Sequence, residues 1–249
     1  MGKMADRILS TIGYPCAIKS PMEQHLQTII KRSAESLAID ALRTYVLSGG
    51  AAPGEKLTEM ALSERLGVSR ATVRTALQRL SVEGLISQIP YTGWEVARLT
   101  AHDAWELWTL RSSLEGLAAR LATERGGTQV KAEVREAMDR LEHACASPDR
   151  RAASEADFGL HKTIVKLAQH GRLIEQYRLI EQQTSLYIQS SNKLIPEPRE
   201  IMEQHLPIVE AILAGRAAQA ARLSEKHNEQ EGTKLVAYLK SRSSTDGEP

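Results

Sequence analysis

The apolar residues between Thr100 and about residue 240 recur at helical spacing throughout, which constrains the fold more than any other feature of the chain. Glycine, proline or serine interrupts this pattern at intervals, and no segment between the interruptions alternates as a strand does. A succession of helices with short connections folds as an antiparallel bundle. We therefore predict about six helices, one running to about Arg125 and the others over residues 128–146, 149–170, 172–194, 198–214 and 216–240.

The composition favours a core made of aliphatic side chains. Aromatic residues make up 4% of the 249 residues and include a single Phe, so Ala, Leu, Ile and Val must fill the interior. This balance favours helices over a β-sandwich. With 42% hydrophobic and 25% charged residues, the composition is that of a globular protein and excludes a wholly disordered chain.

The sequence gives no sign of a membrane or secreted protein. No stretch approaches the roughly 20 apolar residues of a membrane-spanning helix. The first 20 residues lack the apolar region and cleavage site of a signal peptide, and we interpret them as part of a tail. Cys16 and Cys145 do not make a disulfide framework, which indicates a reducing compartment. We expect a cytoplasmic protein.

The first hundred residues have a different organisation. A helix beginning near Ser33 ends at a Ser-Gly-Gly turn, and Thr58 and Ser69 are placed to cap two further helices that glycines end. The segments LISQIP and YTGWEVARL then predict two short strands joined by a turn. Helices followed by a β-hairpin in this order predict a winged helix-turn-helix, so the fold class is mainly α. The predicted divisions are an arm (1–33), the winged domain (34–99), an all-helical bundle (100–240) and a polar tail (241–249).

The last helix of the winged domain has the composition of a DNA-reading helix. Between Val68 and Val82 there are three arginines and no acid, and the outward side carries Arg70, Thr72, Arg74 and Gln78. A helix N-terminus with arginine in its first turns can meet phosphates and guanine edges. Residues 1–99 carry 12 Lys and Arg against 9 Asp and Glu, so a polyanion should engage this part. The alternative is a solvated helix face without a partner.

The segment LRTYVLSGGAAPGEKLTEMALSERLGVSRATVRTALQRLSVEGLISQIPYTGWEVARLT resembles the GntR family of bacterial transcription regulators over the whole winged domain. The resemblance implies that Ser69, Arg70, Thr72 and Arg74 contact an operator and that Gly93 lies at the wing tip near the minor groove. It departs from the family at Met60, where an arginine is common, and at Thr72, which replaces a proline. One winged domain makes few contacts, so we expect a homodimer on a palindromic operator in double-stranded DNA.

Four residues of the bundle are spaced to hold a metal ion. Asp157 and His161 are one helical turn apart and share a face. His205 and His227 lie equally far on either side of the turn at Gly215, so in a helix hairpin they stand at the same height. A carboxylate and three imidazoles suit zinc, nickel, manganese or iron. The alternative for each histidine is an ordinary core or surface residue.

The bundle resembles the FadR C-terminal domain (FCD) subfamily, beginning with AWELWTLRSSLEGLAARLA and carrying DxxxH, a later HxxIxxAI and a final histidine. The resemblance implies a divalent metal, zinc first, on Asp157, His161, His205 and His227, with positions open for a small carboxylate effector. It also aligns Arg111 with an effector-binding arginine, although a pair between Arg111 and Glu115 is the alternative. Pro207 should kink its helix or place His205 near the helix start.

Three hypotheses follow from these residues. The first is a dimeric, metal-containing transcription regulator, a repressor, that responds to a small organic acid and is not an enzyme. The second is a metal-dependent hydrolase that docks to nucleic acid, against which the chain offers no nucleophile motif and no phosphate-cradling glycine loop. The third keeps the regulator but has a purely structural metal, or none, with Arg111 supplying the effector contacts.

Overall fold

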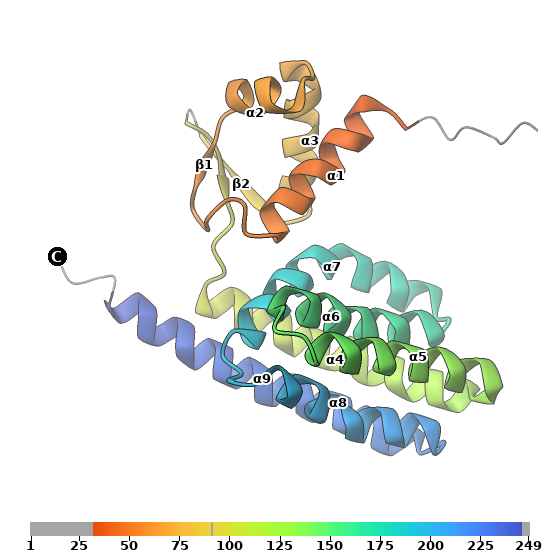
Figure 1. The fold of residues 1–249 in the computed structure, drawn as a ribbon. Coiled ribbons are helices and arrows are strands. Elements are labelled where there is room, and N and C mark those ends of the chain that lie inside the picture. Colours follow the sequence, from red (N-terminus) through yellow and green to blue (C-terminus); the bar gives the residue numbers. More distant parts are fainter. Residues whose placement is uncertain (1–31, 91, 246–249) are drawn as a thin grey trace, which may run out of the picture. The chain divides into compact units, whose positions relative to one another are not determined.

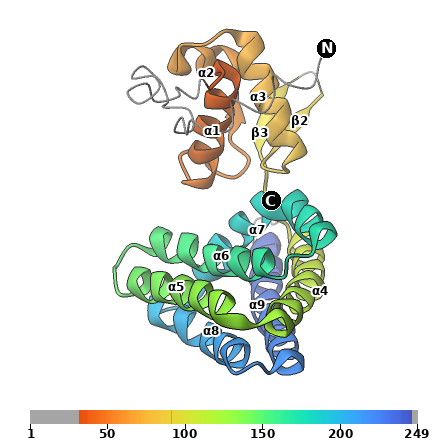
Figure 2. The ribbon, with the colours of Figure 1, turned by 90° about the vertical axis from the view of Figure 1, so that its right-hand side faces the viewer.

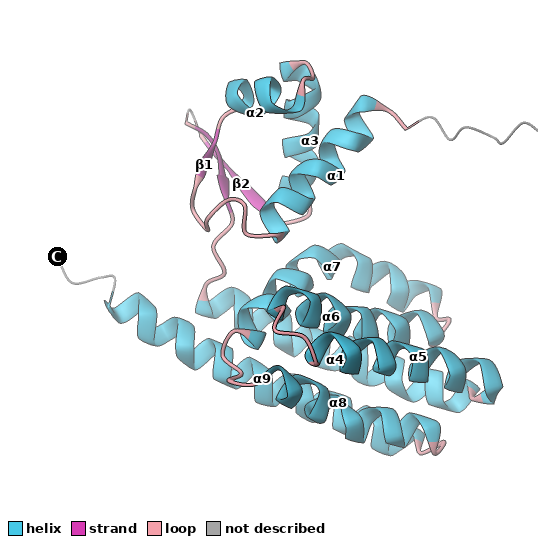
Figure 3. Cartoon of the chain, in the orientation of Figure 1, coloured by secondary structure: helices cyan, strands magenta, loops and turns pink. Residues whose placement is uncertain are grey.

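The computed structural model describes residues 32–90 and 92–245 (Figure 1). Most of the predicted arm and the last residues of the predicted tail lie outside the described residues. The described chain forms α1 (Ala34–Leu47), β1 (Lys56–Leu57), α2 (Glu59–Leu66), α3 (Arg70–Val82), β2 (Ile86–Ile89), β3 (Gly93–Val96), α4 (Ala101–Arg125), α5 (Gly127–Cys145), α6 (Arg150–Leu167), α7 (Gly171–Asn192), α8 (Pro198–Leu213) and α9 (Ala217–Thr245). In the described residues the strands are confined to the part before α4 (Figure 3).

The winged part is assembled around α3, whose apolar face is fully buried. Val73, Leu77 and Leu80 are inaccessible to solvent and pack with residues of α1 and of the sheet. The sheet is antiparallel with the order β1-β3-β2, and the central strand β3 places Trp94 opposite Leu57. The winged helix-turn-helix is therefore confirmed. The strand β1 was not predicted, because two residues are too few to show an alternating pattern.

Capping residues fix where the helices of the winged part begin. Thr58 and Ser69 are the N-caps of α2 and α3, and each side-chain oxygen accepts a backbone N–H three residues later. Gly67 ends α2 in the left-handed conformation with φ 64°, which costs a glycine little. These three residues set the tight turn between α2 and α3, and so set the direction of α3.

The helices α4 to α9 form the predicted bundle (Figure 2). Thr100 caps α4 in a capping box with Asp103, as the sequence predicts. The helices α4 and α9 pack along each other, and two glycines let them approach closely. A Cβ on Gly232 would meet Trp108, and one on Gly116 would meet Glu225. Alanines fill much of the core, including Ala118, Ala119 and Ala122 of α4, which are fully buried.

One of the two alternatives expected at Pro207 and one helix end need correction. The helix α8 runs from Pro198 to Leu213 with Pro207 inside it, so His205 lies midway along the helix and not near its start. Buried Ile201 and Ile208 anchor the helix on both sides of the proline, which offsets the missing hydrogen bond. The helix α9 continues to Thr245, beyond the predicted end at residue 240.

Among the described residues, no helix combines the length and the apolar character that crossing a membrane requires.

Candidate functional site

The outward face of α3 carries the predicted DNA-reading side chains. Arg70, Arg74 and Gln78 are exposed, Thr72 is half-buried, and the hydroxyl of Thr72 lies 2.9 Å from that of the N-cap Ser69. Gly93 begins β3 opposite Ile89 and has φ 118°, a conformation that favours glycine at the wing tip. Met60 on α2 is 62% exposed. The six predicted DNA-reading residues thus lie on α3, at its N-cap or at the hairpin.

The guanidinium of Arg74 is already paired within the protein. Its Nε and Nη2 donate to the two carboxylate oxygens of Glu59, each at 2.8 Å. Nη2 of Arg70 lies 3.9 Å from the same carboxylate. No local pattern in the sequence indicates Glu59, because 15 residues separate it from Arg74 and the pair forms only when α2 folds against α3.

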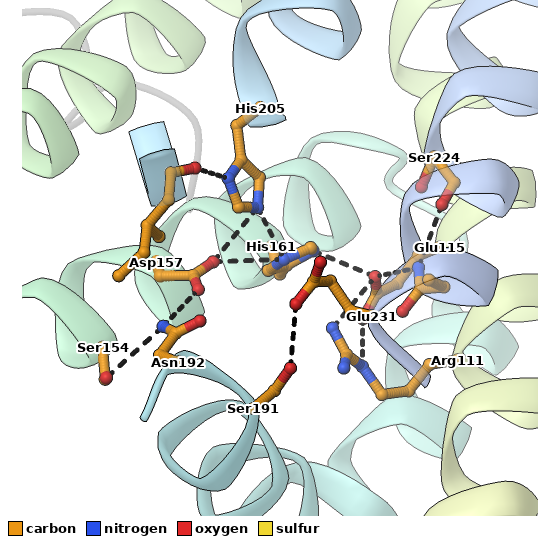
Figure 4. Close-up of polar contacts among 12 residues, drawn as sticks. Arg111, Glu115, Ser154, Asp157, His161, Ser191, Asn192, His205, Ser224 and Glu231 are labelled. Carbon is orange, nitrogen blue, oxygen red and sulfur yellow. Dashed lines mark hydrogen bonds and ion pairs between the residues drawn. The ribbon is translucent and has the colours of Figure 1, made fainter. Parts of the chain in front are cut away.

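In the bundle, the structure brings the four predicted metal ligands together from three helices. Asp157 and His161 come from α6, His205 from α8 and His227 from α9. Each histidine offers a ring nitrogen, and these nitrogens lie within 4.8 Å of one another. The ring centroids of His205 and His227 are 4.4 Å apart, across the hairpin that the sequence predicts. Figure 4 shows Asp157, His161 and His205 pointing toward one another.

Hydrogen bonds fix the tautomers of two of these histidines. Nδ1 of His161 lies 2.9 Å from the carboxylate of Glu115, and Nδ1 of His205 lies 2.7 Å from the carbonyl oxygen of Ile201. Both partners can only accept, so both Nδ1 atoms carry protons and donate them. The two Nε2 atoms are therefore the nitrogens that can act as ligands.

Three potential ligand atoms consequently meet at one buried point. Nε2 of His161 and Nε2 of His205 are 3.1 Å apart, and they lie 3.3 and 3.1 Å from Oδ1 of Asp157. That oxygen has no hydrogen-bond partner among the described residues. Ligand atoms around a tetrahedral zinc ion lie about 3.3 Å from one another, given metal–ligand distances of about 2.0–2.1 Å. These residues therefore fit a divalent cation.

The electrostatics of the cluster agree with a cation at this point. Burial lowers the pKa of His161, but the carboxylates of Glu115 and Asp157 outweigh it and raise the pKa to about 9. Burial raises the pKa of Asp157, yet the electrostatic interaction with His205 and the hydrogen bonds to His161 and His205 hold it well below its usual value. Burial and the neighbouring histidines lower the pKa of His227, so that ring is neutral at pH 7 and its nitrogen lone pair is free to coordinate.

Glu115 of α4, which the sequence indicates only as an alternative partner for Arg111, contacts four buried side chains. Its buried carboxylate accepts from Arg111 (3.0 Å), from the hydroxyl of Tyr177 (2.9 Å) and from the amide of Asn228 (2.8 Å), besides His161. Burial opposes its ionisation, but Arg111 and His161 hold its pKa well below the usual value. Glu115 therefore orients a candidate ligand and balances a buried guanidinium.

A second supporting residue, Asn192 at the end of α7, was also not anticipated. Its amide donates to Oδ2 of Asp157 at 2.8 Å and to Ser154 at 3.3 Å. This contact holds the carboxylate so that Oδ1 faces the histidines. The loop after Asn192 is tied to α6 by Arg150, which donates to the carbonyl oxygens of Asn192 and Ile195.

Arg111, the predicted effector-binding residue, is 2% exposed and pairs with Glu115, as the alternative interpretation has it. Its guanidinium carbon lies 5.0 Å from the ring centre of Tyr187. Several buried polar atoms of α4, α7 and α9 have no hydrogen-bond partner in the described part of the chain: Thr184 Oγ1, Tyr187 OH, Asn228 Oδ1 and Trp108 Nε1. Buried polar atoms in this state call for a partner such as water or a ligand.

Comparison with known proteins agrees with both halves of this description. Residues 35–96 match the bacterial regulatory proteins of the gntR family, and residues 106–230 match the FCD domain. The chain is 28% identical over 228 residues, 91% of its own length and 96% of the relative's, to the probable D-xylose utilization operon transcriptional repressor of Paenarthrobacter nicotinovorans. It is 31% identical over 166 residues, 66% of its length and 76% of the relative's, to the Nta operon transcriptional regulator of Aminobacter aminovorans.

The fold is also found in solved structures. A GntR transcriptional regulator from Rhodococcus sp. RHA1 superposes with a TM-score of 0.73 at 24% identity, covering 83% of this chain and 99% of that one. The chain therefore belongs to the GntR family of bacterial regulators and carries an FCD domain. The family and these relatives regulate transcription and are not enzymes, so the hydrolase hypothesis is set aside.

Proposed function

We propose that this regulator is a repressor that binds a divalent metal through Asp157, His161, His205 and His227 and releases its operator when a small carboxylate effector binds beside the metal. The observation that carries the metal site is the meeting of three potential ligand atoms, Oδ1 of Asp157 and the Nε2 atoms of His161 and His205, within 3.3 Å of one another at a buried point. When bound, the metal supplies a Lewis-acidic position for an anionic ligand. The repressor role has support from the relative named for repression of a sugar-utilization operon.

The donor set indicates which metals suit the site. Imidazole nitrogens favour zinc, nickel and iron over magnesium or calcium, and a single carboxylate suits all of these ions. Zinc is the first choice, with nickel, manganese and iron as alternatives. Hydrogen bonds from neighbouring groups fix the orientation of three candidate ligands: Glu115 contacts His161, the carbonyl of Ile201 contacts His205 and Asn192 contacts Asp157.

We place the small organic acid beside Arg111, where its carboxylate would compete with Glu115 for the guanidinium. A planar carboxylate is the ligand that a buried guanidinium binds best, and the unpartnered hydroxyls of Thr184 and Tyr187 offer further donors. Effector binding would then shift the population between DNA-competent and DNA-incompetent states of a homodimer. The third hypothesis, with a structural metal or none, differs by predicting an effector response that a chelator leaves unchanged.

We assign operator contacts to Ser69, Arg70, Thr72, Arg74, Gln78 and Gly93, with two copies of the chain on a palindromic site in cytoplasmic DNA. The support is their common placement on α3 and the hairpin together with the family membership.

Replacing Arg74 with alanine should weaken binding to the operator about 5- to 150-fold, because one arginine contact to a guanine is worth about 1–3 kcal/mol. Enrichment from a random duplex library identifies the operator, and fluorescence anisotropy then measures affinity. Arg79→Ala is the matched control, since Arg79 is an exposed arginine on the same helix outside the assigned contacts. Equal affinities for the two variants, with unchanged melting temperatures, would refute the assignment of Arg74.

A further inference from the structure

The two arginines on the reading face of α3 share one acidic partner that is much less exposed than they are. The side chain of Glu59 is 16% exposed, whereas those of Arg74 and Arg70 are 58% and 66% exposed. Arg74 meets Glu59 side-on through two hydrogen bonds of 2.8 Å. An exposed ion pair is usually weak and mobile, but a bidentate pair with a largely covered carboxylate has a defined geometry.

The fold holds Glu59 itself in place. It is the first residue of α2, directly after the N-cap Thr58, and the neighbouring Leu57 is paired in the sheet with Trp94. The pKa of the Glu59 carboxyl is lowered by the hydrogen bond from Arg74 first and, against a small effect of burial, by a further one from Trp94. The carboxylate is therefore ionised at neutral pH and lies where α2, α3 and β3 meet.

This contact decides which part of Arg74 is left for DNA. The edge formed by Nε and one N–H of Nη2 is taken by Glu59, so the edge formed by Nη1 and the other N–H of Nη2 is the one left to bind a base. A guanine binds one edge of a guanidinium through O6 and N7. Arg74 can therefore present a single edge in a single direction.

We propose that Glu59 is a specificity-determining positioning residue: it aims the outer edge of Arg74 at a base and lowers the positive charge that the reading face presents to any DNA. The inference rests on the proposed operator contacts. The two effects act together, because fixed geometry favours the correct base pair and a neutralising carboxylate disfavours contacts that depend on phosphate alone.

The test compares three variants on two duplexes: the operator enriched by the wild type from a random library, and a scrambled duplex of equal length and composition. Glu59→Gln should reduce the ratio of operator to scrambled affinity about tenfold and bind the scrambled duplex more tightly, with a steeper salt dependence. Glu59→Asp keeps the charge but is too short for the bidentate contact. In this variant the ratio of operator to scrambled affinity should also fall about tenfold, while the affinity for the scrambled duplex stays unchanged.

Glu64→Gln is the matched control, because Glu64 lies exposed on the same helix and its substitution makes the same change in charge. It should raise affinity for both duplexes equally and leave their ratio intact. Thermal melting by circular dichroism checks that each variant folds. If Glu59→Gln does not fold, the comparison is made with Glu59→Asp. A ratio for both Glu59 variants within twofold of the Glu64→Gln ratio overturns the inference. Failure of the wild type to enrich any sequence contradicts the operator contacts themselves, and the inference with them.

Discussion

Glu115→Gln should destabilise the protein by about 3–5 kcal/mol and lower its zinc affinity roughly 10- to 100-fold. The substitution preserves shape but leaves the Arg111 guanidinium, 2% exposed, without a counter-charge. It also replaces one carboxylate oxygen by an NH2 group, which cannot accept a hydrogen bond. The remaining oxygen cannot accept from all the donors of Glu115, among them His161 and Asn228. Urea unfolding and competition titration with a zinc chelator measure the two effects separately.

A second variant separates the contribution to folding from the contribution to the metal. Removing both charges, in Arg111→Met with Glu115→Gln, should restore part of the stability because no buried charge remains unpaired. Zinc affinity should stay low, since His161 still lacks its carboxylate partner. Glu124→Gln, at an exposed position of the same helix, is the matched control and should change neither quantity. Normal zinc affinity in Glu115→Gln would contradict the role assigned to Glu115.

Removing the metal should destabilise the protein increasingly as the pH rises from about 6.5 to about 9. In the metal-free protein, the pKa of His161 is about 9, against about 6.5 in an unfolded chain. Because the pKa of His161 is higher in the folded protein, protonation of His161 adds its full contribution to the free energy of unfolding below about pH 6.5. This contribution disappears as the pH rises past about 9. The loss amounts to about 3 kcal/mol, because each unit of pKa difference corresponds to about 1.4 kcal/mol.

The metal-loaded protein should not show this loss, since the cation replaces the proton between the acceptors. His227 does not obscure the result, because its lowered pKa matters only below about pH 6.5, where the unfolded chain gains a proton that the folded protein does not. Urea unfolding with and without chelator, at several pH values, makes the comparison, and added zinc should restore the lost stability. Identical pH profiles for the two forms would contradict a metal at these residues.

Most of the fold could be predicted because its signals are local. Caps at Thr58, Ser69 and Thr100 and the glycine at Gly67 are read within a few residues. The errors arose where tertiary packing decides, as in β1, which exists only by pairing with β3, and in α8, which burial holds together across Pro207. The polar, serine-rich segment after residue 240 has no apolar periodicity and so predicts a tail, but α9 continues through it, and Ser241 and Ser243 donate to carbonyl oxygens of the preceding turn.

The candidate site was only partly predictable. The equal distances of His205 and His227 from Arg216, in the turn at Gly215, indicate their meeting, and the one-turn spacing places His161 beside Asp157. The contact between Glu115 and Asn228 spans 113 residues, and no local pattern reports it. One signal was present, since Arg111 and Glu115 lie on the same stripe of α4 as the fully buried Ala118 and Ala122. Charges on a buried stripe indicate a polar network inside the bundle.

The most direct test of the account is the metal content of the purified protein, measured by inductively coupled plasma mass spectrometry. We expect close to one equivalent of a divalent transition metal per chain in the wild type, and almost none in the double variant His205→Ala/His227→Ala. The control His102→Ala/His143→Ala removes two exposed histidines outside the cluster and should keep the metal. A wild type that holds no metal even after reconstitution with zinc, nickel, manganese or iron(II), or a double variant that retains it, would contradict the account.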